Sequence, residues 1–152
     1  MTFGRRALVG AGLAACALLL TGCLGATAGS GCNRQARADI EEGLAYVDLH
    51  CGTGTEVTSG VTINVTYTGR LRDGTVFDSS GRRKGQPLSV KVGIGQVIPG
   101  VDKGVVGMRA GGTRRLVIEP GLAYGRQGYP GLVPPQETVV YDVTVRSVDQ
   151  GG

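Results

Sequence analysis

The chain has 152 residues, which is enough for one domain with a hydrophobic core. Its formal net charge is +4, from 16 basic and 12 acidic residues, but two of the arginines lie in an N-terminal stretch with the features of an export signal. Without residues 1–22 the chain keeps 14 basic and 12 acidic residues, a net charge of +2. That charge excludes the dense basic surface of a nucleic-acid-binding domain, so no nucleic acid is expected as a partner.

Residues 1–22 are laid out like a secretory signal, with two arginines before an apolar run that is short for a membrane-spanning helix. The run ends in Leu20-Thr21-Gly22-Cys23, which resembles a bacterial lipobox. The resemblance implies a lipoprotein signal peptide after whose removal Cys23 is the acylated N-terminus, and two or more acyl chains anchor a protein stably. The alternative is a plain signal peptide that is cleaved nearby.

We therefore expect an exported protein that is lipid-anchored to a bacterial membrane, on its periplasmic side or at the cell surface. Residues 23–40 are small, polar and rich in glycine, a composition typical of a flexible tether. The folded domain is expected over residues 41–149.

The four cysteines bear on the compartment. Cys16 would leave with the signal and Cys23 would be acylated, so Cys32 and Cys51 remain. An even pair in an oxidising compartment favours a disulfide. Two free thiols or a metal pair are the alternatives, but a metal site needs two more ligands and the chain has a single histidine, His50. We expect the disulfide and no metal.

Alternation of apolar and polar residues predicts strands along most of the domain. The expected strands cover residues 41–49, 61–68, 76–80, 87–92, 113–118 and 139–145. The pair Asp73-Gly74 is typical of a tight hairpin turn between two of them. Short connections of this kind predict an antiparallel α+β domain without repeats.

One stretch, residues 96–108, predicts a helix. Pro99 suits the first helical turn, and Val101, Val105 and Met108 form an apolar stripe at i, i+4 and i+7. The glycines at 111 and 112 would end the helix. About twelve residues at about 1.5 Å rise give a rod of about 18 Å, which needs a sheet to lie on.

No set of residues for nucleophilic catalysis or for cradling a phosphate is present, and no cofactor is expected. Instead, aromatic and apolar residues fall at the ends of the predicted elements, with one carboxylate, Asp78, among them. A loop at residues 121–135 is long and rich in glycine and proline, and loops of this kind are often functional. Ordinary core packing is the alternative for each aromatic residue, and composition alone favours it.

Several separate segments resemble the FKBP-type peptidyl-prolyl cis–trans isomerases in order and spacing. They are Val65-Thr66-Tyr67-Thr68-Gly69 with Leu71, Asp73-Gly74-Thr75-Val76-Phe77-Asp78-Ser79-Ser80, Gly95-Gln96-Val97-Ile98-Pro99-Gly100, Gly107-Met108 with Gly111-Gly112, and Leu122-Ala123-Tyr124-Gly125 with Pro134-Pro135. The match extends over residues 44–148, nearly all of the predicted domain. It implies a five- or six-stranded antiparallel sheet curved around the helix at residues 99–108.

The resemblance also implies the site. The catalytic residues would be Tyr67, Phe77, Asp78, Ile98 and Tyr124, and the substrate would further contact Leu88, Val97, Val101, Tyr129, Leu132, Val133 and Tyr141. The Ile98 N–H and the Tyr124 hydroxyl would each donate to a substrate carbonyl. Asp78 would be held by the Tyr67 hydroxyl and by Arg82 or Arg83. Val101 departs from the family, because most relatives have tryptophan there as the pocket floor.

The expected partners are proline-containing segments of exported proteins, whose folding the chain would assist outside the cytoplasm as a monomer. An apolar residue, Leu or Phe, is expected before the proline. A macrolide of the rapamycin type is a further expected ligand, with affinity weakened by Val101. The alternative function is a non-catalytic FKBP-like binding module at the membrane: the matching pocket residues favour catalysis, and Val101 favours the alternative.

Overall fold

The structure is a computed structural model that describes residue 32 and residues 37–151. The expected signal peptide and Cys23 lie outside the described residues. Within the described part of the chain, no helix is long and apolar enough to cross a membrane.

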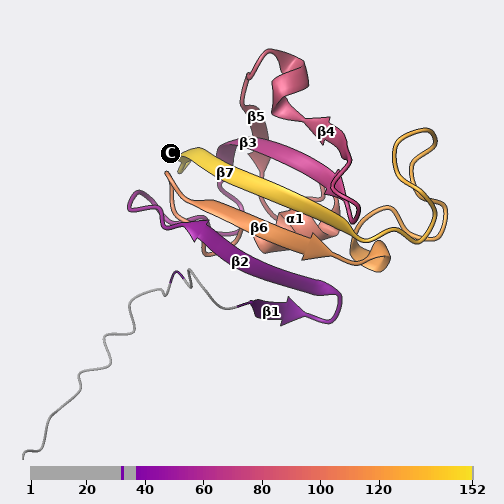
Figure 1. The fold of residues 1–152 in the computed structure, drawn as a ribbon. Helices are drawn as coiled ribbons and strands as arrows, with labels where there is room; N and C mark the ends of the chain where they lie inside the picture. The colour runs from indigo at the N-terminus through magenta and orange to yellow at the C-terminus, as the bar shows by residue number, and fades with distance from the viewer. Residues whose placement is uncertain (1–31, 33–36, 152) are drawn as a thin grey trace, which may run out of the picture.

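In residues 37–151, seven strands form one antiparallel sheet, on which the one α-helix of this range lies (Figure 1). The strands are β1 (Ala38–Glu41), β2 (Leu44–His50), β3 (Thr62–Leu71), β4 (Val76–Ser79), β5 (Leu88–Lys91), β6 (Thr113–Ile118) and β7 (Val139–Asp149). The helix is α1 (Pro99–Gly104), and two 3₁₀ turns are η1 (Ser80–Arg83) and η2 (Pro120–Leu122). The sheet order is β1-β2-β6-β7-β3-β4, and β5 also pairs with β3. The predicted α+β fold is confirmed.

The strand count is seven rather than five or six, because residues placed in the tether form an edge strand. Ala38 lies opposite Tyr46 of β2, and the turn between the two strands uses Gly43 at a φ of 82°. The strand is short and almost wholly exposed, so the alternation in Ala38-Asp39-Ile40-Glu41 does not mark a buried face. A hairpin partner, rather than a buried face, makes it a strand.

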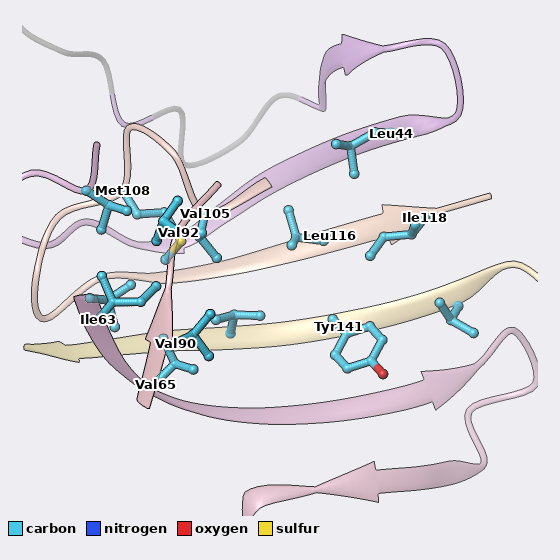
Figure 2. Packing of buried hydrophobic residues seen from close by; sticks show 14 of the residues in the cluster. Leu44, Ile63, Val65, Val90, Val92, Val105, Met108, Leu116, Ile118 and Tyr141 are labelled. Carbon is cyan, nitrogen blue, oxygen red and sulfur yellow. The ribbon is translucent and has the colours of Figure 1, made fainter. Parts of the chain in front are cut away.

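Alternation predicted the central strands because one face of the sheet is buried. Every second residue of β7 from Val139 to Val145 is buried, and β3 buries Ile63 and Val65 in the same way. Figure 2 shows these side chains meeting those of β6 and β5, among them Leu116 and Val90. The aromatic member of this layer is Tyr141, whose hydroxyl points away from the surrounding aliphatic side chains (Figure 2).

Helix α1 begins at Pro99, as predicted, but it ends at Gly104 and not near residue 108. Its buried face is Gly100, Asp102 and Gly104 rather than the expected stripe. A Cβ atom on Gly104 would lie 2.6 Å from Cδ2 of Leu116, so the helix lies on β6 closer than any side chain allows. Val105 and Met108 are buried, but beyond the end of the helix.

A buried arginine fixes the end of α1 against the sheet. Arg114 of β6 donates from Nε to Asp48 of β2 at 2.6 Å, and both side chains are buried. Its Nη1 donates to the carbonyl oxygens of Gly104 at 3.0 Å and Val106 at 3.2 Å, which have no partner inside the short helix. The guanidinium also lies 4.0 Å from the centre of the Tyr46 ring. Arg114 therefore contacts a carboxylate, two backbone carbonyl oxygens and an aromatic ring.

A disulfide joins Cys32 to Cys51, with 5.7 Å between the two Cα atoms. This is the pairing expected from the cysteine count. Cys51 directly follows β2, and Gly54 and Val57, a few residues later, donate backbone hydrogen bonds to Ala110 and Met108. The disulfide thus ties the chain before β1 to the segment that borders the end of α1.

Candidate active site

A cavity of about 380 Å³ opens between the start of α1 and the sheet. Its lining includes residues from four of the five groups of segments on which the family resemblance rests, all except Gly107-Met108 with Gly111-Gly112. The lining residues are Ile63, Val65, Tyr67, Asp78, Arg83, Leu88, Val90, Gln96, Val97, Ile98, Val101, Val105, Tyr124, Tyr141 and Val143. Eight of the twelve residues expected at the site are in this set, so the strands and the helix start bring most of the expected site together.

Phe77 is an expected site residue that does not line the cavity. Its side chain is buried, and its ring meets those of Tyr124 and Tyr141 edge-on, with centroid distances of 5.9 and 5.7 Å. Edge-to-face contacts of this kind are favourable and orient the rings. Phe77 therefore supports the aromatic wall from behind.

The three expected residues of the long loop, Tyr129, Leu132 and Val133, do not line the cavity. Tyr129 and Val133 exchange backbone hydrogen bonds of 2.8 and 2.9 Å, and the Tyr129 ring lies 6.0 Å from that of Tyr124. Leu132 and Val133 line a separate shallow hollow with Leu71. Leu88, by contrast, was expected to contact the substrate and does line the cavity.

Asp78 is the carboxylate of the cavity. Its Oδ2 accepts a hydrogen bond of 2.9 Å from the Tyr67 hydroxyl, as expected, and its Oδ1 accepts one of 2.8 Å from the backbone N–H of Ser79. Burial, and then the bond to Asp78, raise the pKa of Tyr67 to about 12. Arg82 differs from the expectation, because its guanidinium donates to the carbonyl oxygen of Phe77 at 2.8 Å.

The hydroxyls of Tyr124 and Tyr141 lie 2.8 Å apart. Burial is the main cause that raises the pKa of both groups above the ordinary value, so both are protonated at neutral pH. One hydroxyl donates to the other, which uses one of the two protons. The second proton is left for an acceptor from outside, and the expected bond from this position to a substrate carbonyl is chemically possible.

The loop before α1 presents the other donor. The Ile98 carbonyl accepts from the N–H groups of Val101 and Asp102, while no described residue accepts a hydrogen bond from the Ile98 N–H. The buried Asp102 carboxylate accepts from the N–H groups of Gly93 at 2.7 Å and Gly95 at 3.0 Å. Asp102 of α1 therefore fixes the loop before the helix.

Val101, the expected floor residue, does line the cavity, but the sequence did not reveal the core residues that line it as well. Past the half-buried Val101 the cavity reaches core side chains of three strands and of the residue after the helix. These side chains belong to Ile63, Val65, Val90, Val105 and Val143. Each follows an ordinary strand or helix pattern, so no sequence signal separates them from residues of a closed core.

Comparison with known proteins gives a consistent result. Residues 53–146 match the family model for the FKBP-type peptidyl-prolyl cis-trans isomerase. The chain is similar to an FK506-binding protein of Neisseria meningitidis serogroup B, with 45% identity over 106 residues that cover 70% of this chain and 96% of that protein. It is also similar to FK506-binding protein 2 of Yarrowia lipolytica, with 50% identity over 93 residues, 61% of this chain and 64% of that one.

Among solved structures, the fold is similar to a peptidyl-prolyl cis-trans isomerase from Pseudomonas syringae pv. tomato, with a TM-score of 0.67 and 30% identity. That likeness covers 76% of this chain and 83% of the other.

Proposed function

The chain belongs to the FKBP-type peptidyl-prolyl cis-trans isomerases, and on this premise we propose that it rotates X–Pro bonds of exported proteins and assists their folding outside the cytoplasm. The observation that carries the proposal is the apolar cavity, which holds one fixed carboxylate and is bordered by two donors without a committed acceptor. The chain spans about two thirds of the Yarrowia relative and nearly all of the Neisseria one.

Rotation about a peptide bond has a barrier of about 18–20 kcal/mol, which comes from amide resonance. At the twisted transition state the resonance is lost and the amide is less polar than in the planar ground state. An apolar cavity stabilises the twisted state relative to the planar one, which water solvates better. Differential binding of this kind is catalysis, and no bond to the substrate has to form.

Different residues of the cavity would bind different parts of the substrate. The proline ring would lie over Val97 and Val101, against the Tyr67 ring. The Ile98 N–H would donate to the substrate carbonyl after the proline, and the free proton of the Tyr124–Tyr141 pair would go to another substrate carbonyl. These two hydrogen bonds would hold the substrate peptide on one side of the X–Pro bond while the part on the other side rotates.

Asp78 acts through a fixed charge. Its oxygens accept hydrogen bonds from the Tyr67 hydroxyl and the Ser79 N–H, so the carboxylate keeps one orientation at the wall. A preorganised charge at a site with little water has a larger effect than the same charge in bulk water. We therefore assign Asp78 an electrostatic role and no proton transfer.

Two features support an extracytoplasmic location for the protein. The first 23 residues resemble a lipoprotein signal, and the Cys32–Cys51 disulfide suits an oxidising compartment. Replacing Cys23 with serine is expected to abolish labelling by a fatty-acid probe and to leave unprocessed precursor. Equal labelling of the Cys23→Ser chain would contradict acylation at this residue.

The alternative is a binding module that holds a partner without turning it over, and the small residue at Val101 favours it. A protease-coupled assay separates the two, in which the protease cleaves only the trans form of an X–Pro peptide. With Leu or Phe before the proline, we expect the protein to shorten the slow phase in proportion to its concentration. Slow phases equal to those in buffer, for several X–Pro peptides, would establish the binding module.

The names of relatives from Neisseria and Yarrowia state that they bind FK506. We propose that this chain binds macrolides of that type in the same cavity, with affinity reduced by the small Val101 side chain.

A further inference from the structure

Two segments that supply lining residues of the cavity contain basic residues and no acidic ones. Residues 79–101, which supply seven of the lining residues, contain four basic residues and no Asp or Glu. Residues 120–136, which supply Tyr124, contain Arg126 and again no acidic residue. The whole domain has nearly balanced charge, so this segregation is local. Asp78 is the single carboxylate among the lining residues.

Arg83 is the cation that lies in the lining itself. Its side chain is exposed, and no described residue forms a hydrogen bond or an ion pair with it. Its charge reaches the site, because it opposes the rise in the pKa of Tyr67. A guanidinium that is unpaired at a concave site is available to an anion from outside.

Asp78 carries the one negative charge among the lining residues, against the positive charges of Arg83 and its two neighbours in the chain. Both of its oxygens accept hydrogen bonds inside the wall, and it forms no ion pair with Arg83. Arg82 and Lys84 flank Arg83 in an exposed turn, and Arg82 is bound only to backbone carbonyl oxygens. The three consecutive cations therefore keep an excess of positive charge at one side of the cavity.

We propose that these three cations select substrates that carry a carboxylate, Asp or Glu, within three residues of the proline. The inference rests on the proposed isomerase function and adds to it a class of substrate. The proline and its apolar neighbour would fill the cavity, while the acidic side chain would pair with Arg83 and, from a neighbouring position, with Lys84. A narrow concave site suits one extended peptide better than it suits a flat anionic bilayer.

The test compares kcat/KM of the full chain for matched peptides with Leu before the proline and Glu, Gln or Lys at each of the three positions on either side. We expect Glu peptides to exceed Gln peptides by roughly three- to tenfold at the best position, the range that one or two exposed ion pairs give. Lys peptides should fall below Gln peptides. The differences should shrink between 20 and 500 mM salt, because salt screens exposed charges.

The variants assign the preference to residues. In Arg83→Gln and Lys84→Gln the ratio of Glu to Gln peptides should fall towards one, and in Arg83→Glu it should invert in favour of Lys peptides. Arg146→Gln, the same charge change on an exposed position of β7 outside the cavity, should keep the full ratio. Circular dichroism on each variant verifies that it is folded.

Turnover of all peptides at rates independent of charge would overturn the inference and leave the isomerase intact. An absence of turnover for every peptide would instead remove the isomerase function on which it rests. Binding of phosphatidylglycerol vesicles through Arg83 and Lys84, without any charge preference among peptides, would overturn it in favour of a membrane surface.

Discussion

Asp78 and Tyr67 show at the scale of single residues how the cavity combines a largely apolar lining with one carboxylate. In Asp78→Ala the Tyr67 hydroxyl loses its acceptor and the wall loses its charge, so we expect kcat/KM to fall about tenfold, as for the loss of one hydrogen bond to a charged group. The melting temperature should change little, because Asp78 is only half-buried at the end of β4. Steady-state kinetics and thermal melts measure the two effects, and unchanged kinetics would contradict the electrostatic role.

The floor residue makes a separate prediction. If a macrolide loses on the order of 80 Å² of apolar contact at Val101, about 25 cal/mol per Å² gives about 2 kcal/mol, or roughly thirtyfold in Kd. Val101→Trp should therefore bind rapamycin more tightly, while peptide turnover changes less, since the floor contacts the proline in ground and transition states alike.

This prediction is tested by measuring rapamycin affinity by calorimetry, together with isomerase rates, for the wild type and Val101→Trp. Wild-type affinity equal to that of Val101→Trp would show that the floor does not set macrolide binding. A large drop in the melting temperature of the variant would show that the core side chains around Val105 and Val143 leave no room for the indole.

The buried tyrosines predict a limit to stability at alkaline pH. The pKa of Tyr67 is raised to about 12, and burial also raises the pKa of Tyr141 above its ordinary value. A tyrosine that holds its proton more tightly when folded stabilises the protein fully below about pH 10, and this stabilisation is lost as the pH rises through the folded value. Urea unfolding at pH 8 to 11.5 should show the decline, with a shallower slope in Tyr67→Phe. An equal slope in the variant would contradict the contribution of Tyr67.

At the residue scale, the sequence revealed Val101 and the polar and aromatic part of the site, but it missed the core residues that also line the cavity. Tyr67 and Asp78 stand in distinctive segments, whereas Ile63, Val90 and Val143 are apolar residues of alternating strands that any core would contain. Whether a core residue borders a cavity depends on the size of the side chain that packs against it from a distant segment of the sequence. Strand patterns do not carry that information.

At the scale of elements, the position of α1 depends on glycine. In Gly104→Ala the new methyl group would lie 2.6 Å from Cδ2 of Leu116, whose side chain is fully buried and cannot move aside. Overpacking costs about 1–3 kcal/mol, which exceeds the gain of up to about 1 kcal/mol in helix propensity. We expect a net loss of stability in urea unfolding.

The matched control is Gly121→Ala, because nothing lies within 4 Å of that added methyl group and the backbone there is ordinary. Its stability should stay within about 0.5 kcal/mol of the wild type. Equal effects of the two substitutions would show that the contact between α1 and β6 is not close-packed.

The same helix shows the limit of pattern reasoning for elements. Pro99 marked its start correctly, because the preference of proline for a first turn is local. Its end could not be predicted from the apolar stripe: Gly107 adopts a φ of 79°, and Arg114 of β6 donates a hydrogen bond to the carbonyl oxygen of Gly104, the last helical residue. Strand β1 was missed for a similar reason, since its pairing with β2 and not its composition makes it a strand.

At the scale of the whole molecule, the topology gathers the site from distant segments. β3 pairs with β7 over its full length, with Gly69 opposite Tyr141, and this pairing brings Tyr67 and Tyr141 to a ring distance of 6.0 Å. β5 and the start of α1 close the other side of the cavity. The family resemblance anticipated this arrangement because several segments agreed in order, whereas alternation alone would have given only an antiparallel sheet.

The central claim is that this cavity catalyses rotation about X–Pro bonds, and NMR exchange spectroscopy tests it most directly. Uncatalysed X–Pro bonds interchange over tens to hundreds of seconds. With catalytic amounts of the protein, exchange cross-peaks between the cis and trans forms of a Leu-Pro peptide should appear within a mixing time of one second and weaken in Asp78→Ala. A folded protein whose peptide spectra show no exchange beyond that in buffer would contradict the account.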